Sequence, residues 1–279
     1  MIKITTDSTA DLTKELYDEF NISVMPLIIT YGNENFIDGE DIVAQDIFDR
    51  YEKDGSLPKT AARSPEDFKE FFAENLKGYD ALIHFSISSE ISSVYNNARM
   101  AAQEFDNVYV VDSRVLSTGI ALLALNACDL AKKGLSAKEI YDESVRLTAF
   151  DQTSFVVDTL EFLYKGGRCS GMAAFASKLL NIKPILNLID GKIEVCGKFM
   201  GKLDKKISTY TSSVFAKYPN ALTNRIFITH AHADQAVVDA VKAQVLERFP
   251  DANIIETFAG STVTSHCGKG TIGVLYLYY

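Results

Sequence analysis

Short apolar stretches alternate with amphipathic segments over the first half of the chain, up to about Phe150. The apolar stretches predict strands, and the segments with apolar residues every three or four positions predict helices. The predicted strands are Ile2–Thr6, Ser23–Tyr31, Ala81–Ser86 and Val108–Val111, and the predicted helices are Asp11–Phe20, Pro65–Leu76, Val94–Gln103, Thr118–Lys133 and Ala137–Thr148. This alternation predicts a mainly parallel sheet flanked by helices.

The segment Thr118–Lys133 is apolar on nearly all sides, which predicts a buried helix. It ends with Lys132, Lys133 and Gly134, a basic last turn followed by a glycine suited to the left-handed conformation. Asp11 falls in the first turn of its predicted helix, where we interpret it as a partner of the helix dipole.

Beyond Phe150, a strand and a helix lead into a predicted hairpin. Its strands, Ile185–Ile189 and Ile193–Cys196, flank Asp190-Gly191, a strong signal for a type I′ turn. Further strands near Arg225–Thr229, Asn253–Phe258 and Gly273–Tyr278 alternate with helices. We therefore predict an α/β fold with an N-terminal domain over 1–150 and a C-terminal α/β layer domain over 151–279, the boundary being approximate.

The chain has 279 residues, of which 47% are hydrophobic and 23% charged, so it can bury a core without a disulfide or a metal. Four cysteines, Cys128, Cys169, Cys196 and Cys267, form no CxxC pair, and we expect reduced thiols. No apolar run reaches the roughly 18 residues of a membrane helix, and no export signal opens the chain, so we expect a soluble, cytoplasmic protein. The net charge of −9 argues against nucleic acid as a partner.

Hydroxyl groups gather where predicted strands end and helices begin. Ligands of open α/β sheets bind beyond the carboxyl ends of the strands, and helix N-termini favour anions. We interpret Thr9, Ser117 and Thr118 as helix caps. One cap cannot use all the serines that follow the third strand, so this cluster predicts a small anionic ligand: Ser86, Ser88, Ser89, Ser92 and Ser93.

Residues 230–234, His-Ala-His-Ala-Asp, end a predicted strand and resemble the start of the two-metal hydrolase motif HxHxDH. Glutamine replaces the last histidine, and only His84 and His266 remain elsewhere, whereas a binuclear site needs about five or six ligands. We predict no metal site, and a metal-dependent hydrolase using His230 and His232 is kept as an alternative. His84 lies among apolar neighbours and is predicted to be a core histidine.

Two segments of the second half are suited to an anion. Gly166-Gly167-Arg168 places a planar guanidinium after a sharp turn, although the glycines also fit a helix C-cap. Ser265–Gly270 resembles a backbone nest in which His266 can donate to an anion. Gly268–Gly273 matches GxGxxG, but only Val274–Tyr279 follow, too few for a βαβ unit, so no nucleotide cofactor is predicted.

A set of motifs, in this order along the chain, resembles the DegV family. They are Asp7–Leu12, Lys59-Thr60 with Ser64-Pro65, Ser88–Ser92 with Tyr95 and Ala98, Val111–Ser113, Gly166–Arg168, Lys183–Leu186 and His266–Gly270. The resemblance covers nearly the whole chain, from Ile2 to Tyr278.

The resemblance implies a two-domain α/β lipid-binding protein that holds one long-chain fatty acid in an internal tunnel. It also implies a bacterial protein that presents the bound carboxylate to a separate ATP-dependent fatty acid kinase subunit for acyl-phosphate formation. Such a protein has no catalytic activity of its own and needs no cofactor. A carrier or sensor of another amphiphilic lipid is the alternative.

Position by position, the resemblance assigns the carboxylate to Thr60 and Ser92, and places Arg168 and His266 beside it. Ser93 and the start of the helix after it add hydrogen-bond donors. The neighbouring residues 61–63, Ala-Ala-Arg, and 93–94, Ser-Val, differ from the Ser-Gln-Pro and Gly-Thr of the family pattern. The acyl chain length and the residues that line the tunnel stay open.

Overall fold

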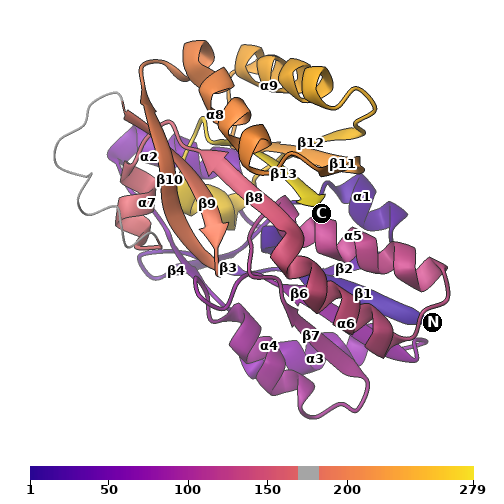
Figure 1. The fold of residues 1–279 in the computed structure, drawn as a ribbon. Coiled ribbons are helices and arrows are strands. Elements are labelled where there is room, and N and C mark those ends of the chain that lie inside the picture. The colour runs from indigo at the N-terminus through magenta and orange to yellow at the C-terminus, as the bar shows by residue number, and fades with distance from the viewer. Residues whose placement is uncertain (169–181) are drawn as a thin grey trace.

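The first half of the chain forms the predicted parallel sheet (Figure 1). This computed structural model describes residues 1–168 and 182–279, so Cys169 lies outside the described residues. The sheet has the order β2-β1-β6-β7, and all its neighbours are parallel. Its strands are β1 (Ile2–Asp7), β2 (Ile22–Met25), β6 (Ala81–Ser86) and β7 (Val108–Asp112). The central strand β6 is buried throughout, as expected for a strand covered on both faces.

Helices cover this sheet near the positions that the periodicity predicts. They are α1 (Lys14–Glu19), α3 (Pro65–Asn75), α4 (Val94–Ala102), α5 (Thr118–Lys132) and α6 (Ala137–Leu147), with 3₁₀ turns η1 (Ser8–Ala10) and η2 (Thr148–Phe150). Helix α3 begins with a capping box between Ser64 and Asp67 and has Pro65 in its first turn. Both features fix where a helix starts.

Helix α5 is buried along most of its length, which confirms the prediction from its apolar sequence. It contacts β1 and β6 of the parallel sheet and also β8, β11 and β13 of the second half. At its end Gly134 has φ +85°, its N–H donates to Ala131, and the N–H of Leu135 donates to Leu130. This is the predicted glycine termination, and it sets the start of the connection to α6.

Two predictions for the N-terminal region are wrong. The strand expected over Ser23–Tyr31 is divided at Pro26, which has no N–H to donate, and Leu27 donates instead to the hydroxyl of Ser8 at 3.1 Å. The helix expected from Asp11 begins only at Lys14. Asp11 itself is buried and left-handed, with φ 53°, so its carboxylate is not a partner of the α1 dipole.

A small antiparallel sheet, which the sequence did not predict, follows that division. Its order is β4-β3-β5, with β3 (Ile28–Tyr31), β4 (Glu34–Ile37) and β5 (Lys59–Ala61), and helix α2 (Ala44–Asp54) lies between β4 and β5 in the chain. Ile29 of β3 pairs with Thr60 of β5, and Ile28 pairs with Ile37 of β4. Because β4 and β5 both pair with β3, the sheet fixes Thr60 and the loop after Ile37 relative to each other.

The second half forms a six-stranded mixed sheet of order β10-β9-β8-β13-β11-β12. Its strands are β8 (Asp151–Val156), β9 (Ile182–Ile189), β10 (Lys192–Met200), β11 (Ala221–His230), β12 (Ile254–Phe258) and β13 (Ile272–Tyr278), and its helices are α7 (Glu161–Gly166), α8 (Leu203–Lys217), α9 (Gln235–Arg248) and α10 (Ser261–Cys267). Asp190 and Gly191, with φ 49° and +82°, join β9 to β10. The predicted hairpin is confirmed, and β10 continues past a bulge beyond Cys196.

The α/β fold class is confirmed, and no sheet combines strands from both sides of residue 150 within the described chain. A domain boundary near residue 150 stays a prediction. Helix α10 of the second half contacts β3, β5, α2 and η1 of the first.

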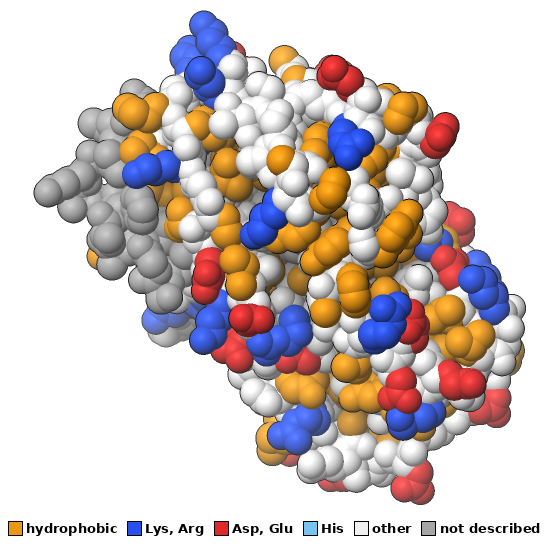
Figure 2. Space-filling view, in the orientation of Figure 1, with side chains coloured by type: hydrophobic (Ala, Val, Ile, Leu, Met, Phe, Trp, Pro, Cys, Tyr) orange, Lys and Arg blue, Asp and Glu red, His pale blue; other side chains and the backbone are white. Residues whose placement is uncertain are grey.

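On the face in Figure 2, basic and acidic side chains are scattered among apolar ones rather than gathered by sign. Of the helices in the described ranges, none has the length and apolar content needed to cross a bilayer.

Candidate ligand-binding site

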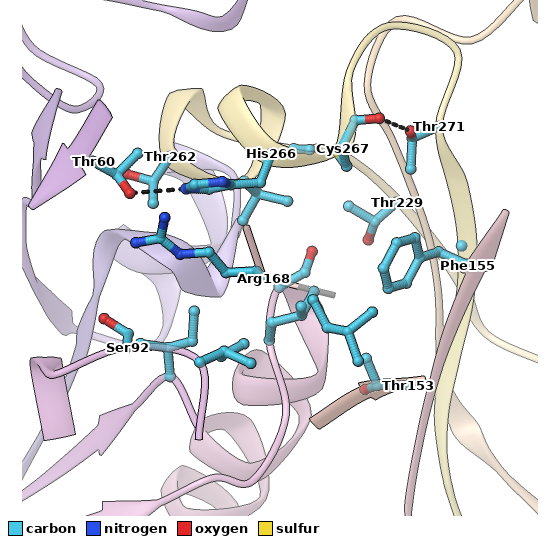
Figure 3. Close-up of a pocket in the computed structure, with 18 of the residues that line it drawn as sticks. Thr60, Ser92, Thr153, Phe155, Arg168, Thr229, Thr262, His266, Cys267 and Thr271 are labelled. Carbon is cyan, nitrogen blue, oxygen red and sulfur yellow. Dashed lines mark hydrogen bonds between the residues drawn. The ribbon is translucent and has the colours of Figure 1, made fainter. Parts of the chain in front are cut away.

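A cavity of about 410 Å³ lies where the parallel sheet, the small sheet and the six-stranded sheet meet (Figure 3). All five residues predicted to bind a ligand line it: Thr60, Ser92, Ser93, Arg168 and His266. Most of the remaining wall is apolar, formed by Leu27, Ile87, Ile91, Leu116, Phe155, Leu163, Ile193, Ala231, Ala259, Val263 and Leu275. The cavity therefore combines a large apolar surface with these five polar side chains, which we call the polar group.

Thr60 and His266 form the most direct contact of the polar group. Thr60 Oγ1 lies 2.8 Å from His266 Nε2, joining β5 to the last turn of α10. Burial, with a smaller contribution from the charge of Arg168, lowers the pKa of His266 to about 4. The imidazole is thus neutral at pH 7 and has one N–H donor. Its Nδ1 is buried, and no residue that the structure describes forms a hydrogen bond with it.

Gly166 leaves the space that the His266 ring occupies. A Cβ atom on Gly166 would lie 2.3 Å from His266 Nδ1, closer than two such atoms can approach. The next residue, Gly167, has φ +67° and ends α7, which confirms the C-cap interpretation of these glycines. The two glycines thus have different roles, one in packing against the histidine and one in the turn.

Arg168 follows this turn at the edge of the cavity (Figure 3). Its side chain is exposed, and its guanidinium donates to the carbonyl of Gly166 at 2.6 Å. That bond uses one of five guanidinium N–H groups. Arg168 therefore lies beside a half-buried, neutral histidine, with donors that no described residue uses.

Ser92 and Ser93 precede helix α4 on the opposite side of the polar group. Ser92 Oγ accepts a hydrogen bond from the N–H of Val94 at 3.3 Å, which leaves its hydroxyl proton able to donate elsewhere. Ser93 is exposed and makes no side-chain cap bond. Both hydroxyls are therefore available to an anion that enters the cavity.

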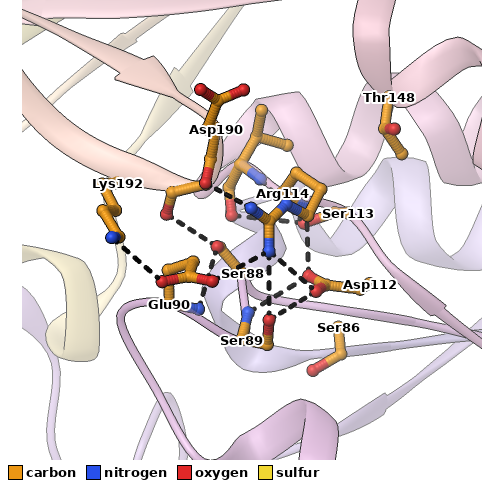
Figure 4. Close-up of polar contacts among 12 residues, drawn as sticks. Ser86, Ser88, Ser89, Glu90, Asp112, Ser113, Arg114, Thr148, Asp190 and Lys192 are labelled. Carbon is orange, nitrogen blue, oxygen red and sulfur yellow. Dashed lines mark hydrogen bonds and ion pairs between the residues drawn. The ribbon is translucent and has the colours of Figure 1, made fainter.

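The other serines of the cluster hold parts of the fold together. Ser86 Oγ donates to Asp7 at 3.2 Å, Ser88 Oγ donates to the carbonyl of Gly191 at 2.7 Å, and Ser89 Oγ donates to Asp112. Arg114 contacts the same loop and the carbonyl of Asp190 (Figure 4). Two serines of the cluster, Ser92 and Ser93, thus line the cavity. The other three hold the loop in place, and Ser88 connects it to the β9–β10 hairpin.

Ser117 occupies the N-cap position of α5 as predicted, but none of the three predicted cap residues makes the side-chain cap bond, because their hydroxyls have other partners. Thr9 Oγ1 donates to Asp7, and Ser117 Oγ donates to Asp11 at 2.6 Å. Thr118 Oγ1 lies 2.6 Å from Thr229 Oγ1 of the second half. The partner of Thr9 is local, two residues earlier in the chain, whereas the tertiary fold brings in the partners of Ser117 and Thr118.

The hydroxyls at the other end of the cavity are also bonded to the protein (Figure 3). Thr153 Oγ1 donates to Asp151 at 2.7 Å, and Thr271 Oγ1 donates to the carbonyl of Cys267 at 2.8 Å. Thr229 Oγ1 has two hydroxyl neighbours, on Thr118 and Thr257. The polar ends of the cavity thus differ, because Ser92 and Arg168 retain donors that no described residue uses, whereas Thr60 on the same side is bonded to His266.

The histidines of the possible metal motif have protein neighbours. His230 Nε2 lies 3.1 Å from Glu256, and His232 packs against the rings of Phe48 and Phe258. In residues 1–168 and 182–279, no three His, Cys, Asp or Glu side chains come together as metal ligands. His84 is buried beside Thr5 at 2.9 Å, with its pKa lowered to about 3 by burial, which confirms a core histidine.

Fold and site together define a mixed α/β protein with an amphipathic cavity between its sheets. The chain belongs to the DegV family, since the family model described as "Uncharacterised protein, DegV family" matches residues 1–279. A DegV domain-containing protein of Deinococcus radiodurans is 31% identical over 98% of this chain and 97% of its own length. The family resemblance of the motifs is thereby confirmed.

Solved structures share the whole fold. A structure described as fatty acid binding of a DegV family protein from Thermus thermophilus has a TM-score of 0.92 and 32% identity, covering 100% of this chain and 99% of that one. The structure of DegV from Bacillus subtilis, described as a fatty acid binding protein, has a TM-score of 0.87 and 26% identity, with coverage of 100% and 99%.

Proposed function

We propose that this protein binds one long-chain fatty acid in the cavity, with the carboxylate beside Thr60, Ser92, Ser93, Arg168 and His266. The observation that carries the proposal is the polarity of the cavity. Among the described residues, Ser92 and Arg168 have unused donors at one end, and the hydroxyls at the other end are already bonded to the protein. The similar proteins from Thermus thermophilus and Bacillus subtilis, both described as binding fatty acids, support the same ligand class.

The energetics favour a ligand with one anionic end and a long apolar chain. Burying an acyl chain contributes roughly 0.8 kcal/mol per CH₂, so the apolar wall supplies most of the affinity. A carboxylate placed there without donors would cost several kcal/mol. Hydroxyl donors from Thr60 and Ser92, with the guanidinium of Arg168, offset that cost and fix the orientation of the ligand.

We further propose that a separate ATP-dependent kinase subunit acts on the bound carboxylate in the cytoplasm, and that this protein supplies the ligand without catalysing a reaction. Arg168 supports this arrangement because it is exposed next to the half-buried His266. The head-group end of the cavity therefore reaches the surface, where a second protein can approach. Phosphoryl transfer needs an acceptor oxygen that the kinase can reach.

The experiment is mass spectrometry of the lipid extracted from purified protein, combined with metal analysis of the same sample. The expected result is one C14 to C18 fatty acid per chain and no stoichiometric zinc. If another amphiphilic lipid is found at one molecule per chain, the ligand is that lipid and not a fatty acid. Stoichiometric zinc, with hydrolytic turnover lost in His232→Ala, would establish the metal-dependent hydrolase instead.

A further inference from the structure

Helix α10 is attached to the small β4-β3-β5 sheet at both of its ends. Its last turn is joined to β5 by the hydrogen bond between His266 and Thr60. Its first turn is joined to Asp38, which directly follows the last residue of β4, Ile37. The two attachments come from the two outer strands of one sheet, β5 and β4, which both pair with β3, so the sheet determines the position of the whole helix.

The attachment at Asp38 is a buried carboxylate with several donors. Asp38 is 4% exposed. Its Oδ1 accepts the N–H of Ser261 at 3.1 Å, and its Oδ2 accepts the N–H of Thr262 at 3.3 Å and the hydroxyl of Thr262 at 2.7 Å. Ser8 Oγ also donates to Oδ2, at 2.8 Å. A carboxylate at a helix N-terminus is favoured both by the free N–H groups and by the helix dipole.

The neighbouring residue before the helix is held in the same way. Gly260 donates its N–H to Asp11 at 2.8 Å. Gly260, Ser261 and Thr262 are therefore each bonded to a carboxylate from the first half of the chain, more than 220 residues earlier in sequence. Folding of the first half thus fixes the start of α10.

The far end of α10 has little freedom to absorb a shift. The ring of His266 is confined by Gly166, where even a Cβ would lie 2.3 Å from Nδ1. On its other nitrogen the ring bonds Thr60 at 2.8 Å. A small rotation of α10 would therefore move His266 relative to Thr60 and Arg168. The hydrogen bond between His266 and Thr60 would then weaken steeply, because its strength depends on its geometry.

We propose that Asp38 is a positioning residue for the head-group end of the cavity. It sets the position of α10 on the small sheet, and through His266 it sets the arrangement of donors around a carboxylate. This inference rests on the proposed function, since it concerns how strongly a fatty acid head group is held. Asp38 itself does not line the cavity, so it acts only through the helix.

The test compares Asp38→Asn with Asp41→Asn, the same substitution at an exposed position of the same loop, whose carboxylate bonds Ile37. Affinity is measured for a fatty acid and for the alcohol of equal chain length. We expect Asp38→Asn to weaken the fatty acid about tenfold, the effect of one hydrogen bond to a charged group. The alcohol should change within about twofold, because the apolar contacts are retained. Asp41→Asn should change neither.

A double-mutant cycle shows whether Asp38 acts through His266. In a His266→Ala background, Asp38→Asn should cause little further loss of fatty acid affinity. Additive losses, or equal losses for acid and alcohol, would overturn the inference. If Asp38→Asn does not fold, Ser8→Ala removes one bond to the Asp38 carboxylate from a residue that does not line the cavity, and it should give a smaller loss with the same selectivity. No selectivity in that variant would also overturn the inference.

The wild-type protein separates this inference from the proposed function. If it binds neither acid nor alcohol, the proposed function fails. If it binds the acid and Asp38→Asn behaves like Asp41→Asn, only the positioning role fails. The imidazole NMR signals of His266 in ligand-free protein add an independent readout, since the chain has four histidines. They should shift in Asp38→Asn and not in Asp41→Asn.

Discussion

Asp151 is a half-buried residue whose Oδ2 atom is buried, and no described cation forms an ion pair with it. Its Oδ1 accepts the hydroxyl of Thr153, and no described residue bonds Oδ2. Burial raises its pKa to about 8. Since this folded-state pKa is above the usual value near 4, the folded protein binds the proton more tightly than the unfolded chain does. The stability from this group is full below about pH 4 and is lost as the pH rises toward about 8.

Asp151→Asn should therefore stabilise the protein progressively between pH 5 and pH 8, because asparagine stays neutral and can still accept from Thr153. The gain relative to wild type should grow by at most about 1.4 kcal/mol per pH unit. Urea unfolding at several pH values measures it. Asp251→Asn, at an exposed position, is the control and should show no such trend. A gain that is constant with pH would contradict the raised pKa.

Ser92 and Thr60 test the head-group site directly. Ser92→Ala and Thr60→Ala should each weaken fatty acid binding by about 1.5 to 3 kcal/mol, since each leaves a carboxylate oxygen without a donor. Isothermal titration calorimetry measures this, with Ser208→Ala on the exposed face of α8 as a control that should bind normally. Unchanged affinity in both site variants would place the carboxylate elsewhere.

Single residues differ in how far the sequence reveals their role. Arg168 and His266 were predicted because they lie in short glycine-rich motifs. Asp38 has no such signal, since it is one of several acids between Glu34 and Asp41 and its partners on α10 are 223 and 224 residues away. Asp11 was misinterpreted for the same reason, because Gly260 and Ser117 reach it only in the folded chain.

Among the elements, the β9–β10 hairpin contacts the loop between β6 and α4, where the hydroxyl of Ser88 donates to the carbonyl of Gly191. Gly191 has φ +82°, and a Cβ there would lie 2.6 Å from Ser88 Oγ and 2.8 Å from Arg114 Cζ. Ile193, two residues further on, lines the cavity. The contact between hairpin and loop therefore forms part of the cavity wall.

Gly191→Ala should separate the hairpin tip from this loop and speed the release of bound fatty acid, because the added methyl overlaps two side chains. Gly78→Ala is the matched control, with φ +84° and no atom within 4 Å of the added Cβ. The control should lose about 1 to 2 kcal/mol of stability from backbone strain alone and release ligand normally. Stopped-flow displacement measures the rates. Equal release rates in the two variants would show that the contact does not retain the ligand.

Elements with strong local signals were predictable, and those stabilised by distant contacts were not. The Asp-Gly turn and the apolar helix α5 are encoded within their own sequences. Strands β3, β4 and β5 are short, and β4 begins with Glu34 and Asn35, so no apolar alternation marks it. This sheet is stabilised by packing on α2 and α10, which only the complete fold brings together.

On the scale of the whole molecule, the cavity depends on both halves of the chain. Helix α5 contacts strands of both larger sheets, and α10 returns from the second half to the small sheet. Thr60 and Ser92 come from the first half, and Arg168 and His266 come from the second. Ligand binding should therefore stabilise the assembled molecule, because only the folded chain forms the site.

Arg168 allows a test of the kinase proposal at this scale. Arg168→Ala should reduce acyl-phosphate formation in an assay reconstituted with the kinase subunit more than it reduces fatty acid affinity, since the exposed guanidinium can contact both proteins. Arg146→Ala, an exposed arginine paired with Glu143, is the control and should change neither quantity. Equal losses in rate and affinity would make Arg168 a ligand contact only.

The most direct measurement is a crystal structure of the delipidated protein reloaded with palmitic acid. We expect a single palmitate in the cavity, with its carboxylate oxygens within hydrogen-bond distance of Thr60 Oγ1 and Ser92 Oγ. Its methyl end should lie among the apolar residues near Phe155 and Leu275. A carboxylate at the Thr153 end, or palmitate bound only outside the cavity, would contradict the proposed function.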